Sequence, residues 1–102
     1  MIHVLAMITT KPGKRDEVLA AFRANVPAVH AEEGCREYGA AVDAEGIGPI
    51  QTKLGPDSFV VVEKWASPAA LAAHGASAHM KEYGAKTREH VANRVIHVLS
   101  PG

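Results

Sequence analysis

The 102-residue sequence has a single cysteine, no surplus of either charge and no long apolar run. One cysteine excludes an internal disulfide, and it is typical of a chain in the reducing cytoplasm. We expect this residue, Cys35, to be a half-buried strand residue rather than a nucleophile. The eleven basic side chains equal the eleven acidic ones, so the positive surplus that nucleic-acid binding requires is missing. No apolar run approaches the roughly 20 residues of a membrane-spanning helix. We therefore expect a cytoplasmic protein without nucleic-acid or membrane partners.

The hydrophobic pattern predicts one domain over residues 1–102 in which strands and helices alternate. Apolar residues on both faces indicate a strand over 2–10, and helical spacing follows over 14–30, with Gly34 as its left-handed end residue. The later elements that we expect are strands at 35–42, 59–65 and 95–99 and helices at 69–74 and 78–92. The connection 43–58 is long and rich in turn-forming residues, although 50–54 could prolong a hairpin.

This order predicts an α+β, ferredoxin-like split β-α-β-β-α-β fold, with a four-stranded antiparallel sheet and both helices on one face. The other face would then expose apolar residues, among them Val60, Val62, Ile96 and Val98. Because a patch of that size usually marks an interface, we expect a homodimer in which two sheets pack face to face. The alternative is a shifted strand boundary, which would exchange the two faces.

Histidine is the most frequent candidate for chemistry, with six copies in the chain. His74 and His79 would lie about 140° apart on a continuous helix, too far for a shared metal ion. A helix break at Gly75 would let both rings converge on one cavity; otherwise one ring is exposed and the other hydrogen-bonded. His30 and Glu32 fall at a helix end, where we expect the carboxylate to be solvated. His90 is expected on a helix surface. Since no third ligand has a suitable spacing, we expect no metal site.

Aromatic and acidic residues form a second group of candidates. Phe59, Glu63 and Trp65 share one face of the strand 59–65. A carboxylate among apolar residues indicates a paired site, a sheet edge or a polar pocket. A lone tryptophan is most often a core residue, yet a strand end is also where a cavity between sheet and helices would be lined. The hydroxyls of Tyr38 and Tyr83 could orient an aromatic ligand.

Together, these motifs resemble the antibiotic biosynthesis monooxygenase family, whose small members include quinol monooxygenases. The resemblance rests on the turn 11–13, the segments 33–38 and 63–65, and the two spaced histidines His74 and His79. It implies a dimeric α+β barrel that oxidises an aromatic polyketide, anthrone or quinol with O₂ and without metal or flavin. The chain departs from the family in having Glu33 where proline is common and in the length of 43–58. It also lacks the first-strand asparagine of haem-degrading relatives, so we do not expect haem breakdown.

The resemblance leads to a hypothesis about mechanism, in which an apolar pocket between sheet and helices binds a reduced aromatic such as a hydroquinone. His79 by preference, and His74 second, would take a phenolic proton, since imidazole titrates near neutral pH. Trp65 would help to position the ring and stabilise the developing oxygen anion. The substrate-binding residues that we expect are Tyr38, Glu63, Phe59 and Tyr83. The electron-rich anion would reduce O₂ directly, so no cofactor is expected. The alternatives are a non-catalytic small-molecule-binding dimer and another enzyme on this fold, such as an isomerase.

Overall fold

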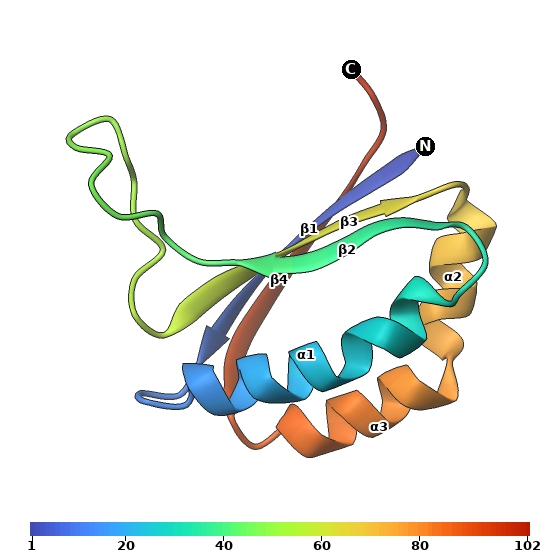
Figure 1. Ribbon diagram of the computed structural model, residues 1–102, viewed down its shortest axis with the longest axis horizontal. Helices are drawn as coiled ribbons and strands as arrows, with labels where there is room; N and C mark the ends of the chain where they lie inside the picture. Colours follow the sequence, from blue (N-terminus) through green and yellow to red (C-terminus); the bar gives the residue numbers. More distant parts are fainter.

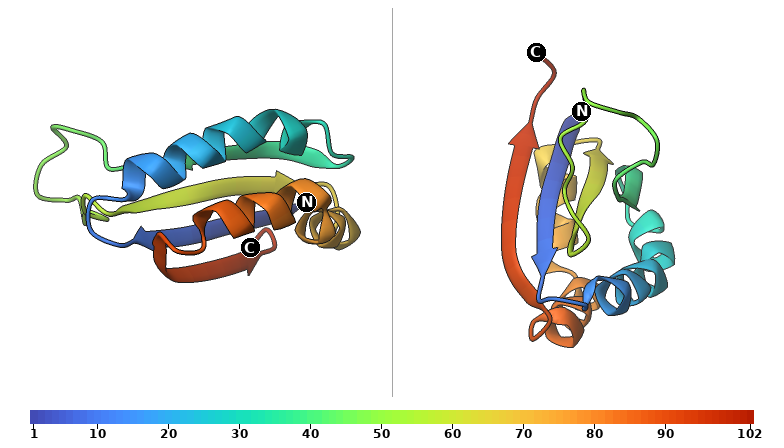
Figure 2. Two further views of the ribbon diagram at one scale, coloured as in Figure 1. Left: turned by 90° about the horizontal axis from the view of Figure 1, so that it is seen from below. Right: turned by 90° about the vertical axis from the view of Figure 1, so that its left-hand side faces the viewer.

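A computed structural model describes residues 1–102 and shows four strands and three helices in the order β-α-β-β-α-α-β. The elements are β1 (Ile2–Thr10), α1 (Arg15–His30), β2 (Cys35–Ala41), β3 (Ser58–Trp65), α2 (Pro68–Ala76), α3 (Ala78–Thr87) and β4 (Val91–Leu99). The strands pair antiparallel in the order β2-β3-β1-β4, and all three helices cover one face of this sheet (Figures 1 and 2). The predicted ferredoxin-like fold is confirmed. None of the helices is long and apolar enough to cross a membrane.

The core lies between the helices and this face of the sheet. Alternate residues of β1 and β3 are buried, as the period of two predicts. The core residues are Val4, Ala6, Ile8, Val18, Leu19, Phe22, Val29, Tyr38, Phe59, Val61 and Trp65. Only four buried residues are polar or charged: Thr10, Glu63, His74 and Thr87.

The second half of the chain differs from the sequence-based boundaries. The last helix ends at Thr87 instead of 92, and β4 begins at Val91 instead of 95. The backbone N–H of Lys11 donates to the carbonyl of His90 at 2.8 Å, which ties the chain to the end of β1 and starts the pairing early. The prediction that His90 is a helical residue was therefore wrong: it lies in the turn after α3, 3.3 Å from Glu17.

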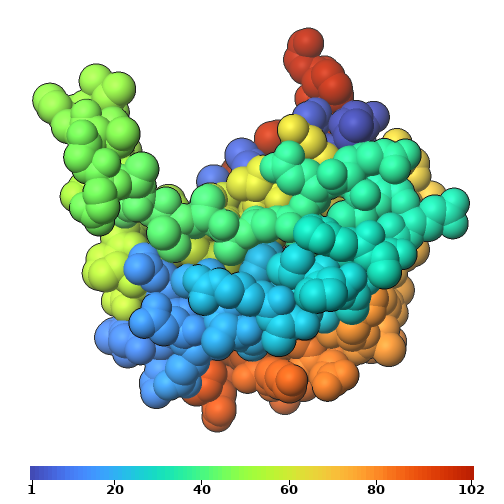
Figure 3. Space-filling view, in the orientation of Figure 1, coloured from blue at the N-terminus to red at the C-terminus, as the bar shows by residue number.

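The long connection contains no strand, so a hairpin prolonged by 50–54 was also wrong. Its base is closed by a side chain instead: the carboxylate of Asp43 accepts from the N–H groups of Leu54 and Gly55 at 2.8 and 2.9 Å. Those two bonds lower the pKa of Asp43. The segment 43–57 projects from the body on the side away from the helices (Figures 1 and 3).

The register of β4 corrects the predicted exposed face. Ile96 pairs with Ala6 and Val98 with Val4, and directly paired residues share a face, so Ile96 and Val98 point to the helix side. The helices do not reach them, and they are 52% and 56% exposed. The prediction that they share a face with Val60 was wrong. The helix-free face instead carries Leu5, Met7, Val60, Val62, Val95 and Leu99.

One glycine fixes the packing of the α1–β2 loop on α2. Gly34 has φ +83°, and a Cβ there would lie 2.6 Å from the Cβ of Ala70. Its carbonyl accepts from the N–H of Ala66 at 2.8 Å. The expected left-handed conformation is confirmed, but Gly34 does not end the helix, whose C-cap is Ala31.

We predict that Gly34→Ala lowers the free energy of unfolding by about 1–3 kcal/mol, because the methyl group adds backbone strain and overlaps Ala70. Urea unfolding measures this loss. Gly75→Ala is the matched control: it lies inside α2 with nothing within 4 Å of the added carbon, and should gain up to about 1 kcal/mol. Equal losses in both variants would contradict the packing argument.

Candidate active site

A polar cluster interrupts the apolar interface between the helices and the sheet. Glu63 and His74 are only 7% and 5% exposed. The indole N–H of Trp65 donates to Glu63 Oε1 at 2.9 Å, and the same oxygen lies 4.0 Å from His74 Nε2. Of the alternatives for Glu63, the structure shows the paired site, which reduces the cost of burying its carboxylate.

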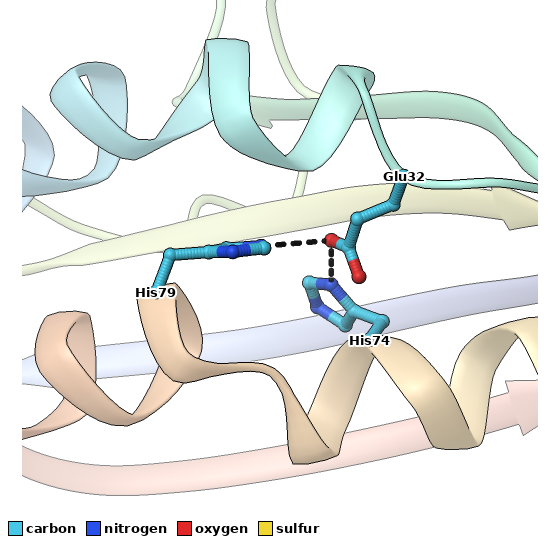
Figure 4. A group of neighbouring side chains, drawn as sticks. All are labelled: Glu32, His74 and His79. Carbon is cyan, nitrogen blue, oxygen red and sulfur yellow. Dashed lines mark hydrogen bonds and ion pairs between the residues drawn. The ribbon is translucent and has the colours of Figure 1, made fainter.

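Three segments meet at a single oxygen of Glu32. His74 Nδ1 lies 2.7 Å and His79 Nε2 3.1 Å from Glu32 Oε2 (Figure 4). Glu32 belongs to the α1–β2 loop, His74 to α2 and His79 to α3. As an ionised carboxylate can only accept hydrogen bonds, both imidazoles donate to it. The two histidines therefore converge, as a helix break was predicted to allow.

The break lies at Ser77 rather than at Gly75. The backbone of Ser77 is extended, and its side chain accepts from the N–H of Met80, which caps α3. Its hydroxyl donates to the carbonyl of His74 at 2.7 Å. Ser77 thus ends α2, turns the chain and starts α3, so that both histidines face the same loop.

Glu32 is the site residue that the sequence analysis missed. We expected its carboxylate to be solvated at a helix end, but its side chain is only 14% exposed. The partners lie 42 and 47 residues further along the chain, so no local spacing connects them. The only signal was an acidic residue two positions before Gly34, the glycine that packs on α2.

The predicted site residues divide into two groups. Trp65 and Tyr38 surround His74, with ring centroids 4.6 and 5.4 Å from the imidazole, and Glu63 lies behind it. Phe59 is fully buried and packs in the core against Phe22. By contrast, His79 and Tyr83 are half-buried and retain some exposed surface. Five of the seven predicted residues therefore lie in or next to one cluster, and Phe59 and Tyr83 lie outside it. The five are His74, His79, Trp65, Tyr38 and Glu63.

Two hollows flank helix α3. A groove of about 190 Å³ lies between α1 and α3, and its lining includes both His79 and Tyr83. Its other lining residues are Ala21, Ala24, Asn25, Glu82 and Lys86. A larger cavity of about 730 Å³ lies between α3 and the β1 and β4 strands. Tyr83 is the one predicted site residue that lines it.

Burial keeps several acidic groups near the site protonated at higher pH than usual. It raises the pKa of Glu63, while the hydrogen bond from Trp65 and, less strongly, the imidazole of His74 act in the opposite direction. It raises the pKa of Tyr38 well above the usual range and that of Tyr83 to about 12. Burial, helped by the charge of Glu32, also raises the pKa of Cys35. The tyrosines are thus hydrogen-bond donors at neutral pH, and Cys35 is not activated as a thiolate.

The same cluster is also the one group of side chains arranged to hold a metal ion. Glu32, His74 and His79 each offer one ligand atom, and these atoms all lie within 4.8 Å of one another. The fold therefore supplies the third ligand, Glu32, that no sequence spacing indicated.

Comparison with known proteins places the chain in a family. Residues 1–86 match the family model of the antibiotic biosynthesis monooxygenases. The chain belongs to this family. It is 40% identical over 104 residues to the Escherichia coli protein named "Probable quinol monooxygenase YgiN", covering 100% of this chain and 99% of that one. The resemblance inferred from the motifs is confirmed.

Solved structures agree with this membership of the antibiotic biosynthesis monooxygenase family. Rv0793 from Mycobacterium tuberculosis superimposes with a TM-score of 0.79 at 28% identity, over 98% of this chain and 93% of that one. A crystal structure described as an antibiotic biosynthesis monooxygenase gives a TM-score of 0.81 at 25% identity, over 100% and 99%. The whole fold is therefore shared, including the elements that carry the cluster.

We predict that the stability difference between wild type and Glu63→Gln depends on pH. Because the pKa of Glu63 is raised on folding, its contribution is fully present below the unfolded pKa and is lost as pH rises through the folded pKa. Glutamine cannot ionise, yet it can still accept from Trp65. The wild type should therefore lose stability relative to Glu63→Gln as pH rises above the ordinary pKa of a glutamate, about 4.3, which urea unfolding at several pH values measures.

The exposed Glu45, changed to glutamine in the same way, provides the background for a carboxylate outside the core. A wild-type advantage that grew with pH would contradict the prediction, since it would mean that the Trp65 hydrogen bond and the imidazole of His74 together outweigh burial.

Proposed function

We propose that this protein is a cofactor-independent monooxygenase that uses O₂ to oxidise a small reduced aromatic, such as a quinol, an anthrone or a polyketide-like ring. The observation that carries the proposal is His79, whose ring lines a groove while its Nε2 bonds to the nearly buried Glu32. Membership of a monooxygenase family and the name of the E. coli relative support the reaction class.

His79 is the general base of this proposal. Since its Nε2–H donates to Glu32, its Nδ1 carries the free lone pair that takes the phenolic proton. The carboxylate of Glu32 stabilises the imidazolium that forms, as a buried acid does for histidine in catalytic triads. His74 holds Glu32 from the other side, and with 5% exposure it acts by positioning the carboxylate rather than by touching the substrate.

The substrate supplies the electrons, so the protein has to bind, orient and deprotonate. Loss of the proton leaves an electron-rich anion that reduces O₂. One oxygen atom enters the ring and the other leaves as water with the two hydrogens that the quinol loses on becoming a quinone. The protonated hydroxyl of Tyr83, on the same groove wall as His79, is placed to donate to a developing oxygen anion.

The other predicted binding residues act behind the groove. Trp65 packs against the imidazole of His74, Glu63 faces its Nε2 at 4.0 Å, and Tyr38 packs on its edge. Phe59 supports this layer from the core. We propose that they fix the orientation of the base, with Trp65 contributing through its bond to Glu63.

We predict O₂ uptake above autoxidation when the chelator-treated protein meets a panel of hydroquinones, naphthoquinols and anthrones. His79→Ala should lower kcat by about a hundredfold or more, the usual contribution of a general base. Ala24→Phe should raise KM, because its exposed side chain would fill the groove beside His79. An oxygen electrode measures both constants.

Two variants serve as matched controls. His90→Ala removes a histidine that contacts Glu17 outside the groove, and Ala85→Phe fills the larger cavity on the other side of α3; both should behave like wild type. A raised KM in Ala85→Phe alone would show that the substrate binds in that larger cavity and not in the groove. If no reduced aromatic causes uptake, the oxidative function is wrong, and a thermal shift with unreacted ligand would favour a binding dimer or an isomerase.

We also propose that the protein forms a homodimer through the helix-free face. That face carries six apolar residues from β1, β3 and β4, with Val95 and Leu99 more than 40% exposed. The 43–57 segment projects on the same side and exposes Ile47, Ile50 and Leu54 (Figure 3). With no net charge, two copies can approach without mutual repulsion.

We predict that Val62→Glu converts the dimer to a monomer, because the substitution places a charge in the middle of the apolar face. Light scattering after size-exclusion chromatography gives the mass. Ala20→Glu, on the exposed surface of α1, should leave the dimer intact. A monomeric wild type would refute the dimer, and an unchanged mass of Val62→Glu would refute this face as its interface.

A further inference from the structure

We infer that Glu32, His74 and His79 form a binding site for a divalent transition-metal ion of the Zn²⁺ class, and that an ion bound there switches off the base. The site itself follows from geometry alone. Only the inhibitory consequence rests on the proposed function.

The donor set and its spacing suit such an ion. Two imidazole nitrogens and one carboxylate oxygen are ligands that Zn²⁺ accepts in three-ligand sites, with water in the fourth position. In a tetrahedral site, bonds of about 2.0–2.2 Å place neighbouring ligand atoms roughly 3.3–3.6 Å apart. The two nitrogens lie 2.7 and 3.1 Å from Glu32 Oε2, and all three ligand atoms lie within 4.8 Å of one another, so side-chain adjustments of less than about 1 Å at the carboxylate make room for an ion.

A buried carboxylate faces the second ring nitrogen of His74, at a distance that a small turn of the imidazole must shorten for a hydrogen bond to form. A ligating histidine normally donates its other ring N–H to a carboxylate or carbonyl, which fixes the tautomer. When His74 Nδ1 binds the ion, its proton resides on Nε2, which faces Glu63 Oε1 at 4.0 Å. Glu63 is itself held by the indole N–H of Trp65 at 2.9 Å. This buried carboxylate behind the histidine is the second observation that points to a metal.

His79 provides the route by which an ion can reach the site. The side chain of His79 is 29% exposed, against 6% for His74 and 14% for Glu32, and it lines the groove between α1 and α3. An ion can enter from this side and keep a water molecule there. Ser77 Oγ lies 3.2 Å from His79 Nε2, and this contact competes with an ion together with the two imidazole hydrogen bonds to Glu32.

Metal binding and base catalysis exclude each other. In the proposed reaction Glu32 accepts from His79 Nε2–H and stabilises the imidazolium. In the metal-bound state Nε2 carries no proton and both it and Glu32 Oε2 are ligands. With Nε2 bound to an ion, the proton of the neutral imidazole resides on Nδ1. His79 then has no lone pair with which to take the phenolic proton.

Isothermal titration of the chelator-treated protein with Zn²⁺ tests the site without any assay of activity. We expect one ion per chain. Glu32→Gln and His79→Ala should each weaken binding at least tenfold, and Glu63→Gln about tenfold, as is usual for an outer carboxylate. His90→Ala is the matched control, because it removes another histidine with nearby carboxylates and should bind like wild type.

The absence of saturable binding, or binding that survives both Glu32→Gln and His79→Ala, would overturn the site. Thermal unfolding with and without Zn²⁺ gives a second readout: wild type should be stabilised and Glu32→Gln should not.

Oxygen uptake then tests the consequence. One equivalent of Zn²⁺ should suppress uptake, and a chelator should restore it. Binding without inhibition, or uptake stimulated by Zn²⁺ or Fe²⁺, would overturn the inhibitory role. A protein that binds Zn²⁺ but shows no uptake with any substrate would refute the proposed function while the metal site stands.

Discussion

The architecture of the site depends on one carboxylate oxygen, Glu32 Oε2, that accepts from two imidazoles at 2.7 and 3.1 Å. This contact joins a loop, α2 and α3. None of these three segments contributes a residue to the buried apolar core. Because charge-assisted hydrogen bonds are stronger than neutral ones, a single atom can fix the relative placement of all three segments. The position of α3 in turn sets the shape of the groove between α1 and α3.

Two backbone features make this contact attainable. Gly34 lets the α1–β2 loop approach α2 so closely that even a methyl group would lie 2.6 Å from Ala70. Ser77 interrupts the helix between His74 and His79 and caps the next turn. On an unbroken helix the two rings would diverge by about 140°. The convergence of the histidines is therefore a property of the local chain, while their common partner comes from a distant loop.

The parts that sequence reasoning predicted are those governed by local signals. The alternation of β3 predicted that Phe59, Glu63 and Trp65 share one face, and a helix break between the two histidines was predicted at Gly75, two residues before the observed break at Ser77. The faces of β4 depend instead on its register with β1, and one residue of shift reverses them, so Ile96 and Val98 were misplaced. Glu32 was missed for a similar reason, since its partners are 42 and 47 residues away and only the assembled fold brings them near.

Stability does not account for the polar cluster. Replacing buried ionic groups by apolar side chains of similar volume is often neutral or stabilising, and burial already disfavours the charged form of Glu63. A chain that needed only a core could fill this layer with leucine. What the cluster adds is an imidazole at the wall of a groove, His79, and a carboxylate that a second, buried imidazole holds behind it. In the proposed reaction His79 Nε2–H donates to Glu32, whereas at the proposed metal site both atoms bind the ion, so the two proposals together make the occupant of Glu32 Oε2 the switch between a base and a metal site.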